Sequence, residues 1–364
     1  DTDRSRGLGD VYKRQAHNIV SIHKSNQSGT DRTEFHSKIS GPQSERRKVN
    51  YTEFVHAVET MINQRKEGGL KATVYTAVKN NDTRRTGVIL ETPGINLSPT
   101  IYLEEFYESY LGGKTINEIV DELLETYEKI KKDESWDYEK IFDFQKVRER
   151  IVYRLVNTEK NEQMLQDVPH REILDLSLIY YVLLDASEKG TTAMLISDRH
   201  MDQWKTTEKI LWSEADRNTR RLLMAECFTM QYAMSELLGA AGKEARREQN
   251  LLESEEKGED KMYVLSNRAR SNGAACMIYP YVLRMMGDIL EEDFYILPSS
   301  IHEVILVPAS AGISVAEMEK MVCEINETQV PEEEILGSHV YRYSRKNKTI
   351  SMGGKAYQVK EETK

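Results

Sequence analysis

The chain has 364 residues, of which 39% are hydrophobic and 30% are charged, and its formal net charge is −10. This balance is typical of one large or two ordinary globular domains, and the negative charge opposes binding to nucleic-acid phosphates. No apolar run reaches the roughly 18 residues that a membrane-spanning helix needs, and the first residues lack a signal-peptide pattern. The three cysteines are far apart, which argues against disulfides and a structural zinc site. We expect a cytoplasmic protein with no cofactor, no nucleic-acid partner and no membrane partner.

Residues 1–48 differ from the rest because they contain few apolar residues and no periodic pattern. We expect residues 1–48 to be extraneous or disordered. Extraneous sequence is favoured, and the alternative is a disordered tail that belongs to the natural protein. The opening DTDRSRGLGDVYKRQ resembles the translated adaptor remnant of a metagenomic reading frame, and residues 45–48 could be encoded by a ribosome-binding sequence before a GUG start at Val49. This segment holds 10 of the 50 basic and 6 of the 60 acidic residues, so the remaining 40 basic and 54 acidic residues give a net charge of −14.

From Asn50 onward, the pattern becomes regular. Asn50 with Glu53, followed by apolar residues at helical spacing, predicts a capped helix, and Thr115 with Glu118 predicts another that runs to about residue 131. Between them, residues 72–79 and 87–91 are β-rich runs that flank a polar segment, which predicts a hairpin. A further helix is expected from Ser98 and Pro99 to residue 110.

The remainder of the chain mixes strands and helices. The middle part predicts strands at 151–156, 174–184 and 191–196, a helix capped by Asp198 and continued over 206–221, and a helix at 228–238. The C-terminal part predicts strands at 262–265, 274–278, 294–297 and 301–307, helices at 281–290 and 315–327, and a hairpin at 340–350. This order indicates an α+β fold with antiparallel or mixed sheets and helices packed on one face.

Residues 242–261 are dominated by charged side chains, which is typical of a solvated linker or loop. We therefore expect an N-terminal α+β region over residues 49–241, a charged linker at 242–261, a C-terminal α+β region over 262–350 and a tail at 351–364.

The segment 294–308, FYILPSSIHEVILVP, places hydroxyl, imidazole and carboxyl groups in an apolar run. In a strand, Ser300 and His302 would share one face, whereas Glu303 would point away and could not orient the imidazole. Ser300 and His302 are therefore candidate catalytic residues, as nucleophile and base. The alternative is that Ser299 and Ser300 form a polar corner after Pro298, while His302 satisfies a backbone group or packs at a sheet edge.

Two other clusters favour structural interpretations. Asp198, His200 and Asp202 offer metal-ligand chemistry, but a helix cap at Asp198 would occupy its carboxylate, so we expect no metal site. The turn at 267–273, NRARSNG, could hold an anion near its two arginines. It lacks the glycine spacing of phosphate-binding loops, and a plain turn between two strands is favoured.

Several blocks carry a resemblance: NYTEFVHAVETMINQR, ETPGINLSPTIYLEEFYE, ESWDYEKI, LPSSIHEVILVP and INETQV. They occur in the order seen in a family of bacterial proteins catalogued only as a domain of unknown function, and the resemblance runs from about residue 50 to 343. The C-terminal half is also distantly similar to a second uncharacterised bacterial family that shares the Pro-Ser-Ser-Ile-His-Glu string. The resemblance implies a bacterial, intracellular protein and a natural start near Val49, and it implies no activity.

Two functions remain open. The first is a non-enzymatic protein-interaction module whose negative charge favours a protein partner with a basic surface. The second is a hydrolase that uses His302 with Ser300.

Overall fold

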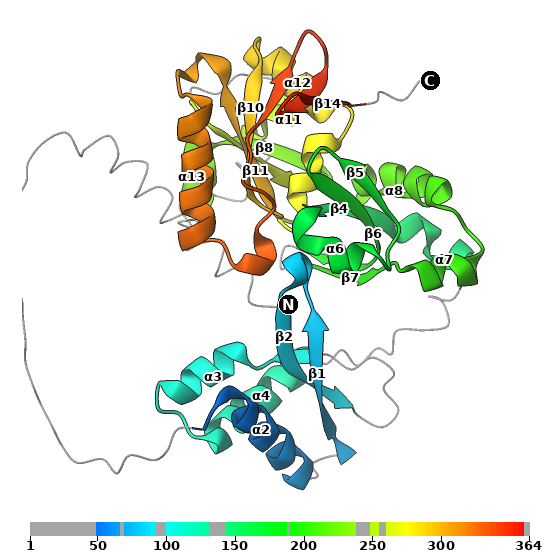
Figure 1. The fold of residues 1–364 in the computed structure, drawn as a ribbon, viewed down its shortest axis with the longest axis vertical. Helices are drawn as coiled ribbons and strands as arrows, with labels where there is room; N and C mark the ends of the chain where they lie inside the picture. Colours follow the sequence, from blue (N-terminus) through cyan, green and yellow to red (C-terminus); the bar gives the residue numbers. More distant parts are fainter. Residues whose placement is uncertain are drawn as a thin grey trace, which may run out of the picture. The chain divides into compact units, whose positions relative to one another are not determined.

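A computed structural model describes residues 49–65, 69–91, 100–130, 143–187, 190–237, 248–254 and 260–359. The expected extraneous segment 1–48 and most of the expected linker at 242–261 lie outside these residues. The described chain forms two compact units (Figure 1). The smaller unit holds the described residues up to 130 apart from Asn80–Asp82, and the larger unit holds Asn80–Asp82 and the described residues from 143 onward.

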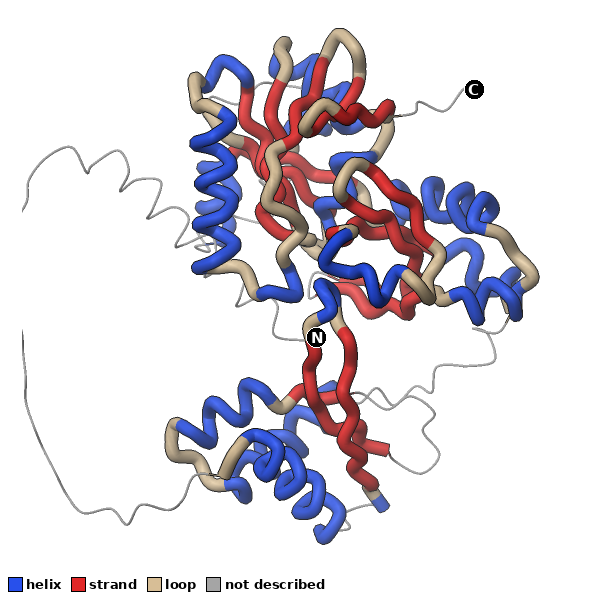
Figure 2. The backbone as a smooth tube through the Cα atoms, viewed as in Figure 1, coloured by secondary structure: helices blue, strands red, loops and turns tan. Residues whose placement is uncertain are grey.

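The smaller unit packs helices on one face of an antiparallel sheet with strand order β1-β2-β3 (Figure 2). Its elements are α2 (Tyr51–Arg65), β1 (Lys71–Val78), β2 (Arg84–Glu91), β3 (Thr100–Tyr102), α3 (Glu104–Leu111) and α4 (Ile116–Ile130). Both predicted capping boxes are confirmed. The backbone N–H of Glu53 donates to Asn50 Oδ1 at 2.9 Å, and that of Thr115 donates to a Glu118 carboxylate oxygen at 2.8 Å. The β1–β2 hairpin is also confirmed.

The helix expected from Ser98 is wrong in its first turn, because residues 100–102 form β3 and α3 begins only at Glu104. Ser98 and Pro99 themselves lie outside the described residues. Strand β3 pairs with β2 through Ile101 opposite Val88. This close approach requires a glycine at position 87, where a Cβ would lie 2.5 Å from the Ile101 carbonyl oxygen.

The larger unit contains two antiparallel sheets. Its first half comprises η2 (Asn80–Asp82), α5 (Phe144–Val147), η4 (Arg148–Arg150), β4 (Ile151–Asn157), η5 (Glu159–Asn161), α6 (Glu162–Leu165), β5 (His170–Ile173), β6 (Leu176–Ser187), β7 (Gly190–Leu195), α7 (Asp198–Trp204) and α8 (Glu208–Leu222). Its second half comprises β8 (Ala225–Thr229), α9 (Met230–Leu237), α11 (Leu251–Ser254), β9 (Tyr263–Asn267), η6 (Gly273–Ile278), α12 (Val282–Leu290), β10 (Phe294–Ser300), β11 (Glu303–Pro308), η7 (Ala309–Ala311), α13 (Val315–Thr328), η8 (Glu332–Glu334), β12 (Tyr341–Ser344), β13 (Thr349–Met352) and β14 (Lys355–Gln358).

In one sheet of the larger unit, β4, β5 and β7 all pair with the long strand β6. The other, which we call the large sheet, has the order β14-β13-β12-β10-β11-β9-β8. The α+β class with antiparallel sheets is thus confirmed. The expected linker at 242–261 does not separate two domains. Strands β8 and β9, which precede and follow it, pair with each other along their whole length in one sheet. The expected tail at 351–364 is also wrong in its first part, because β13 and β14 complete the large sheet.

The large sheet is covered on both faces. Phe294 and Ile296 of β10 enter the main core with η6 and α12, whereas Leu297 of β10 and Ile305 of β11 enter a second core with α9 and α13. Figure 1 shows α13 lying along β10 and β11. Burial on both faces explains why residues 294–308 read as a continuous apolar run without alternation.

Three other local predictions are wrong. Residues 274–278 form the 3-10 helix η6 instead of a strand, and the segment is buried throughout and approaches β9 closely. The helix expected from residue 228 starts at Met230, because Phe228 and Thr229 end strand β8. The cap of α7 is Ser197 rather than Asp198, since Ser197 and His200 form a reciprocal capping box.

Candidate functional site

Ser300 and His302 do not share a strand. Strand β10 ends at Ser300, which is paired with Glu303 at the start of β11, so Ile301 and His302 form the two-residue turn of a β-hairpin. A β-bulge just before the turn shifts the register between Pro298 and Ser300. The strand alternation that the sequence predicted for this segment therefore does not apply.

This turn is buried, and its backbone polar groups are hydrogen-bonded within the larger unit. His302 is only 2% exposed and Ile301 only 5%, so each backbone group needs a partner. The hydrogen bonds run from Ile301 N–H to the Glu334 carbonyl (2.8 Å), from Ala274 N–H to the Ile301 carbonyl (3.2 Å), from His302 N–H to Ser300 Oγ (3.0 Å) and from the Ser266 hydroxyl to the His302 carbonyl (2.7 Å). The Ser300 hydroxyl thus accepts from the His302 backbone, and among the described residues no hydrogen bond joins it to the imidazole.

The His302 ring lies between a backbone amide and a carboxylate. The N–H of Asn272 donates to Nδ1 at 3.1 Å, and because an amide can only donate, Nδ1 carries no proton. The proton of the neutral ring therefore sits on Nε2, which lies 3.4 Å from Glu334 Oε1. Asn272 can reach the ring because Gly273 follows it, and a Cβ at Gly273 would lie 2.6 Å from the His302 carbonyl oxygen.

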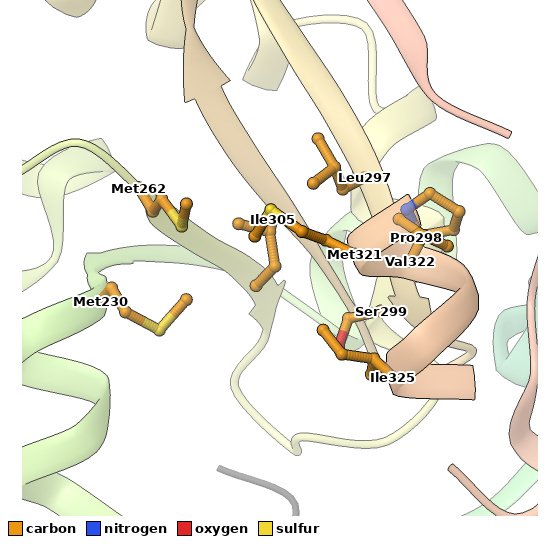
Figure 3. Close-up of a pocket in the computed structure, with 9 residues that line it drawn as sticks. All are labelled: Met230, Met262, Leu297, Pro298, Ser299, Ile305, Met321, Val322 and Ile325. Atoms are coloured by element: carbon orange, nitrogen blue, oxygen red, sulfur yellow. The ribbon is translucent and has the colours of Figure 1, made fainter. Parts of the chain in front are cut away.

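An apolar pocket lies on the α13 side of the large sheet and is partly open to solvent. Its lining comes from four segments: α9, the residue before β9, the β10–β11 hairpin and α13. The lining residues are Met230, Met262, Leu297, Pro298, Ser299, Ile305, Met321, Val322 and Ile325. Figure 3 shows Met230 and Met262 on one side and the side chains of α13 on the other. We call this cavity the methionine pocket.

The lining of the methionine pocket is almost entirely apolar. Among its described lining residues, Ser299 supplies the polar side chain, and the others are apolar. Methionine side chains are flexible and polarizable, so they adapt to apolar groups of different shape. Sequence reasoning missed this site because each methionine, taken alone, is typical of a core position, and its segments lie far apart in the chain.

The other candidate clusters are engaged locally. The His200 Nδ1 accepts from the Ser197 N–H at 3.0 Å, and burial lowers the pKa of this imidazole. No group of three or more His, Cys, Asp or Glu side chains in the described chain is placed to hold a metal ion. In the turn at 267–273, the N–H of Ser271 donates to the Asn267 side chain and that of Asn272 to His302. Arg270 pairs with Glu236 at 3.0 Å.

The cysteine thiols at 227, 276 and 323 are free. Burial raises the pKa of Cys227 and Cys276, which keeps both thiols protonated. Of the helices that the structure describes, none has the length and apolar character needed to cross a bilayer.

The fold and the methionine pocket define an α+β protein of two compact units, with an apolar pocket on the larger one. The chain belongs to the family of unknown function DUF5688, whose model matches residues 51–345. No match was found among curated proteins or solved structures.

Proposed function

We propose that the protein is a non-enzymatic protein-interaction module of the bacterial cytoplasm that binds a partner with a basic surface. The methionine pocket carries this proposal. It can hold an apolar group, but its described lining offers no acid, base or activated nucleophile for proton transfer or covalent catalysis. Free thiols suit a reducing compartment.

The charge of the chain supports the choice of partner. The formal net charge is −10 for the whole sequence, and such a field attracts basic proteins and speeds their association. The same field opposes nucleic acids and anionic membranes, so we propose neither as a partner.

The alternative function is hydrolysis with His302 as base and Ser300 as nucleophile. The observation that favours it is the carboxylate of Glu334 at 3.4 Å from Nε2, because a carboxylate next to a histidine is a common catalytic pair. Hydrolysis of p-nitrophenyl esters by the full chain, lost in both Ser300→Ala and His302→Ala, would support the alternative. Our proposal expects no turnover above that of buffer.

The interaction proposal is tested by cross-linking and affinity purification of the tagged full chain from its native host. Wild type is compared with Met321→Ala and with Val315→Ala. Val315 is 42% exposed on the same helix but does not line the pocket. We expect a protein that is recovered reproducibly with wild type and Val315→Ala and is depleted with Met321→Ala. Recovery of no such protein would contradict the proposal.

A further inference from the structure

We infer that the methionine pocket receives one apolar side chain of a basic peptide segment, whose lysine or arginine residues lie along the Glu317–Glu324 edge of α13. This inference rests on the proposed function and specifies the partner's chemistry.

The burial of α13 shows which edge of the helix borders the pocket mouth. Met318, Val322 and Asn326 are buried, and the Asn326 side chain donates to the Gly337 carbonyl at 2.9 Å, so that edge is packed against the chain. Met321 and Ile325 line the pocket and are only half-buried. The pocket therefore opens on the Met321 side of the helix.

Carboxylates border this open side. Glu317 precedes Met321 by four residues and Glu324 follows it by three, so both lie beside it on the helix surface. Both side chains are exposed. Hydrogen bonds from the Ser314 hydroxyl and backbone lower the pKa of Glu317, which keeps it charged, and a carboxylate that accepts from a capping residue retains lone pairs for a cation.

A cation of the partner would compete with one local ion pair on this edge. Lys320 Nζ lies 3.6 Å from Glu324 Oε1, with the two side chains 77% and 57% exposed. Such exposed pairs contribute little to stability. Replacing the ion pair between Lys320 and Glu324 by a pair between Glu324 and a lysine or arginine of the partner therefore costs little free energy.

Other occupants fit the charge less well. A second copy of this chain carries the same net charge of −10 and would be repelled. A fatty acid or other anionic lipid would bring its carboxylate to an acidic edge. A basic peptide with an apolar anchor satisfies both features, because methionine-rich surfaces accommodate varied apolar anchors.

The test is a selection of random peptides displayed on phage against the immobilised full chain, with counter-selection on Met321→Ala. Selected peptides are then synthesised and their affinities measured by fluorescence anisotropy. We expect an apolar residue flanked by lysine or arginine. Met321→Ala should weaken binding about five- to tenfold, and Val315→Ala should leave it unchanged.

The charge is tested with two matched variants. Glu324→Gln and Glu319→Gln each remove one negative charge from α13, but Glu319 lies two residues before Met321, on the opposite side of the helix. We expect Glu324→Gln to weaken binding about two- to fivefold and Glu319→Gln to have little effect. Equal effects of the two variants would overturn the inference.

The outcomes separate this inference from the proposed function. Selected peptides that depend on Met321 but lack basic residues would overturn the basic partner and leave the interaction module standing. Selection of no peptide that depends on Met321 would overturn the use of the pocket itself. Met321-dependent association of the chain with itself, measured by sedimentation, would replace the peptide with a second copy.

Discussion

At the scale of single residues, Ser300 and His302 show how polar groups in an apolar run can serve a buried turn. The two lie close together, as the sequence indicated, but the hydroxyl caps a backbone N–H and the ring accepts another. This arrangement matches the alternative that the sequence left open, in which His302 satisfies a backbone group. The sequence showed the residue types but did not predict the turn. One long strand and a tight hairpin with a two-residue turn can have the same apolar composition.

The role of the His302 ring in the turn predicts a stability effect. His302→Ala removes the acceptor of the Asn272 N–H, which is partly buried, and leaving such a donor unsatisfied costs toward the lower end of about 1–3 kcal/mol. We expect a loss of this size in the free energy of unfolding measured in urea. His339→Ala is the control, because His339 is 61% exposed and pairs with Asp175 at the surface. That variant should lose less than about 1 kcal/mol, and equal losses in the two variants would contradict this role.

At the scale of elements, local signals were reliable where they depend on neighbouring residues. Capping boxes and helical spacing predicted α2 and α4, because a cap and its partner are three residues apart. The same rules failed for η6, whose conformation depends on contact with β9 and on Gly273. They also failed to separate β8 from α9, because the two elements follow one another directly and no glycine, proline or polar cluster marks the boundary at Met230.

The capping box of α7 predicts a pH dependence. The pKa of His200 is lowered from its ordinary value of 6.5 by burial, and its unprotonated Nδ1 accepts from the Ser197 N–H. The folded state thus favours the neutral ring, so this contribution is fully present above about pH 6.5 and is lost as the pH falls through the lower folded pKa. A cap is worth about 0.5–1 kcal/mol at such a partly exposed site.

The measurement is the thermal unfolding midpoint of wild type and His200→Gln between pH 7 and pH 5. Glutamine can close a capping box but does not titrate in this range, so we expect the variant to lose less stability than wild type on acidification. His56→Gln is the control, because His56 is 67% exposed on α2. If His56→Gln flattened the pH profile as much as His200→Gln, the dependence would not arise at α7.

At the scale of the whole molecule, the sequence predicted the class and the charge but not the assembly. Strands β8 and β14 belong to one sheet although more than 120 residues separate them, and no local pattern encodes that order. The methionine pocket has the same origin, because α9, β10, β11 and α13 meet only in the folded chain. A domain boundary placed by composition at 242–261 therefore cut through the large sheet.

A pocket of apolar side chains beside carboxylates predicts two separable contributions to binding. The attraction between exposed charges is screened as salt rises, since the Debye length falls from about 10 Å at 0.1 M to about 3 Å at 1 M. Burial of an apolar anchor is not screened.

For a basic peptide selected on the full chain, we therefore expect the dissociation constant of wild type to rise with NaCl. The dissociation constant of Glu324→Gln, divided by that of wild type, should fall toward one as salt rises. The dissociation constant of Met321→Ala, divided by that of wild type, should stay constant. Fluorescence anisotropy from 0.05 to about 1 M NaCl measures all three quantities. A Met321→Ala effect that vanished with salt would mean that the peptide is held by charge alone and that the pocket stays empty.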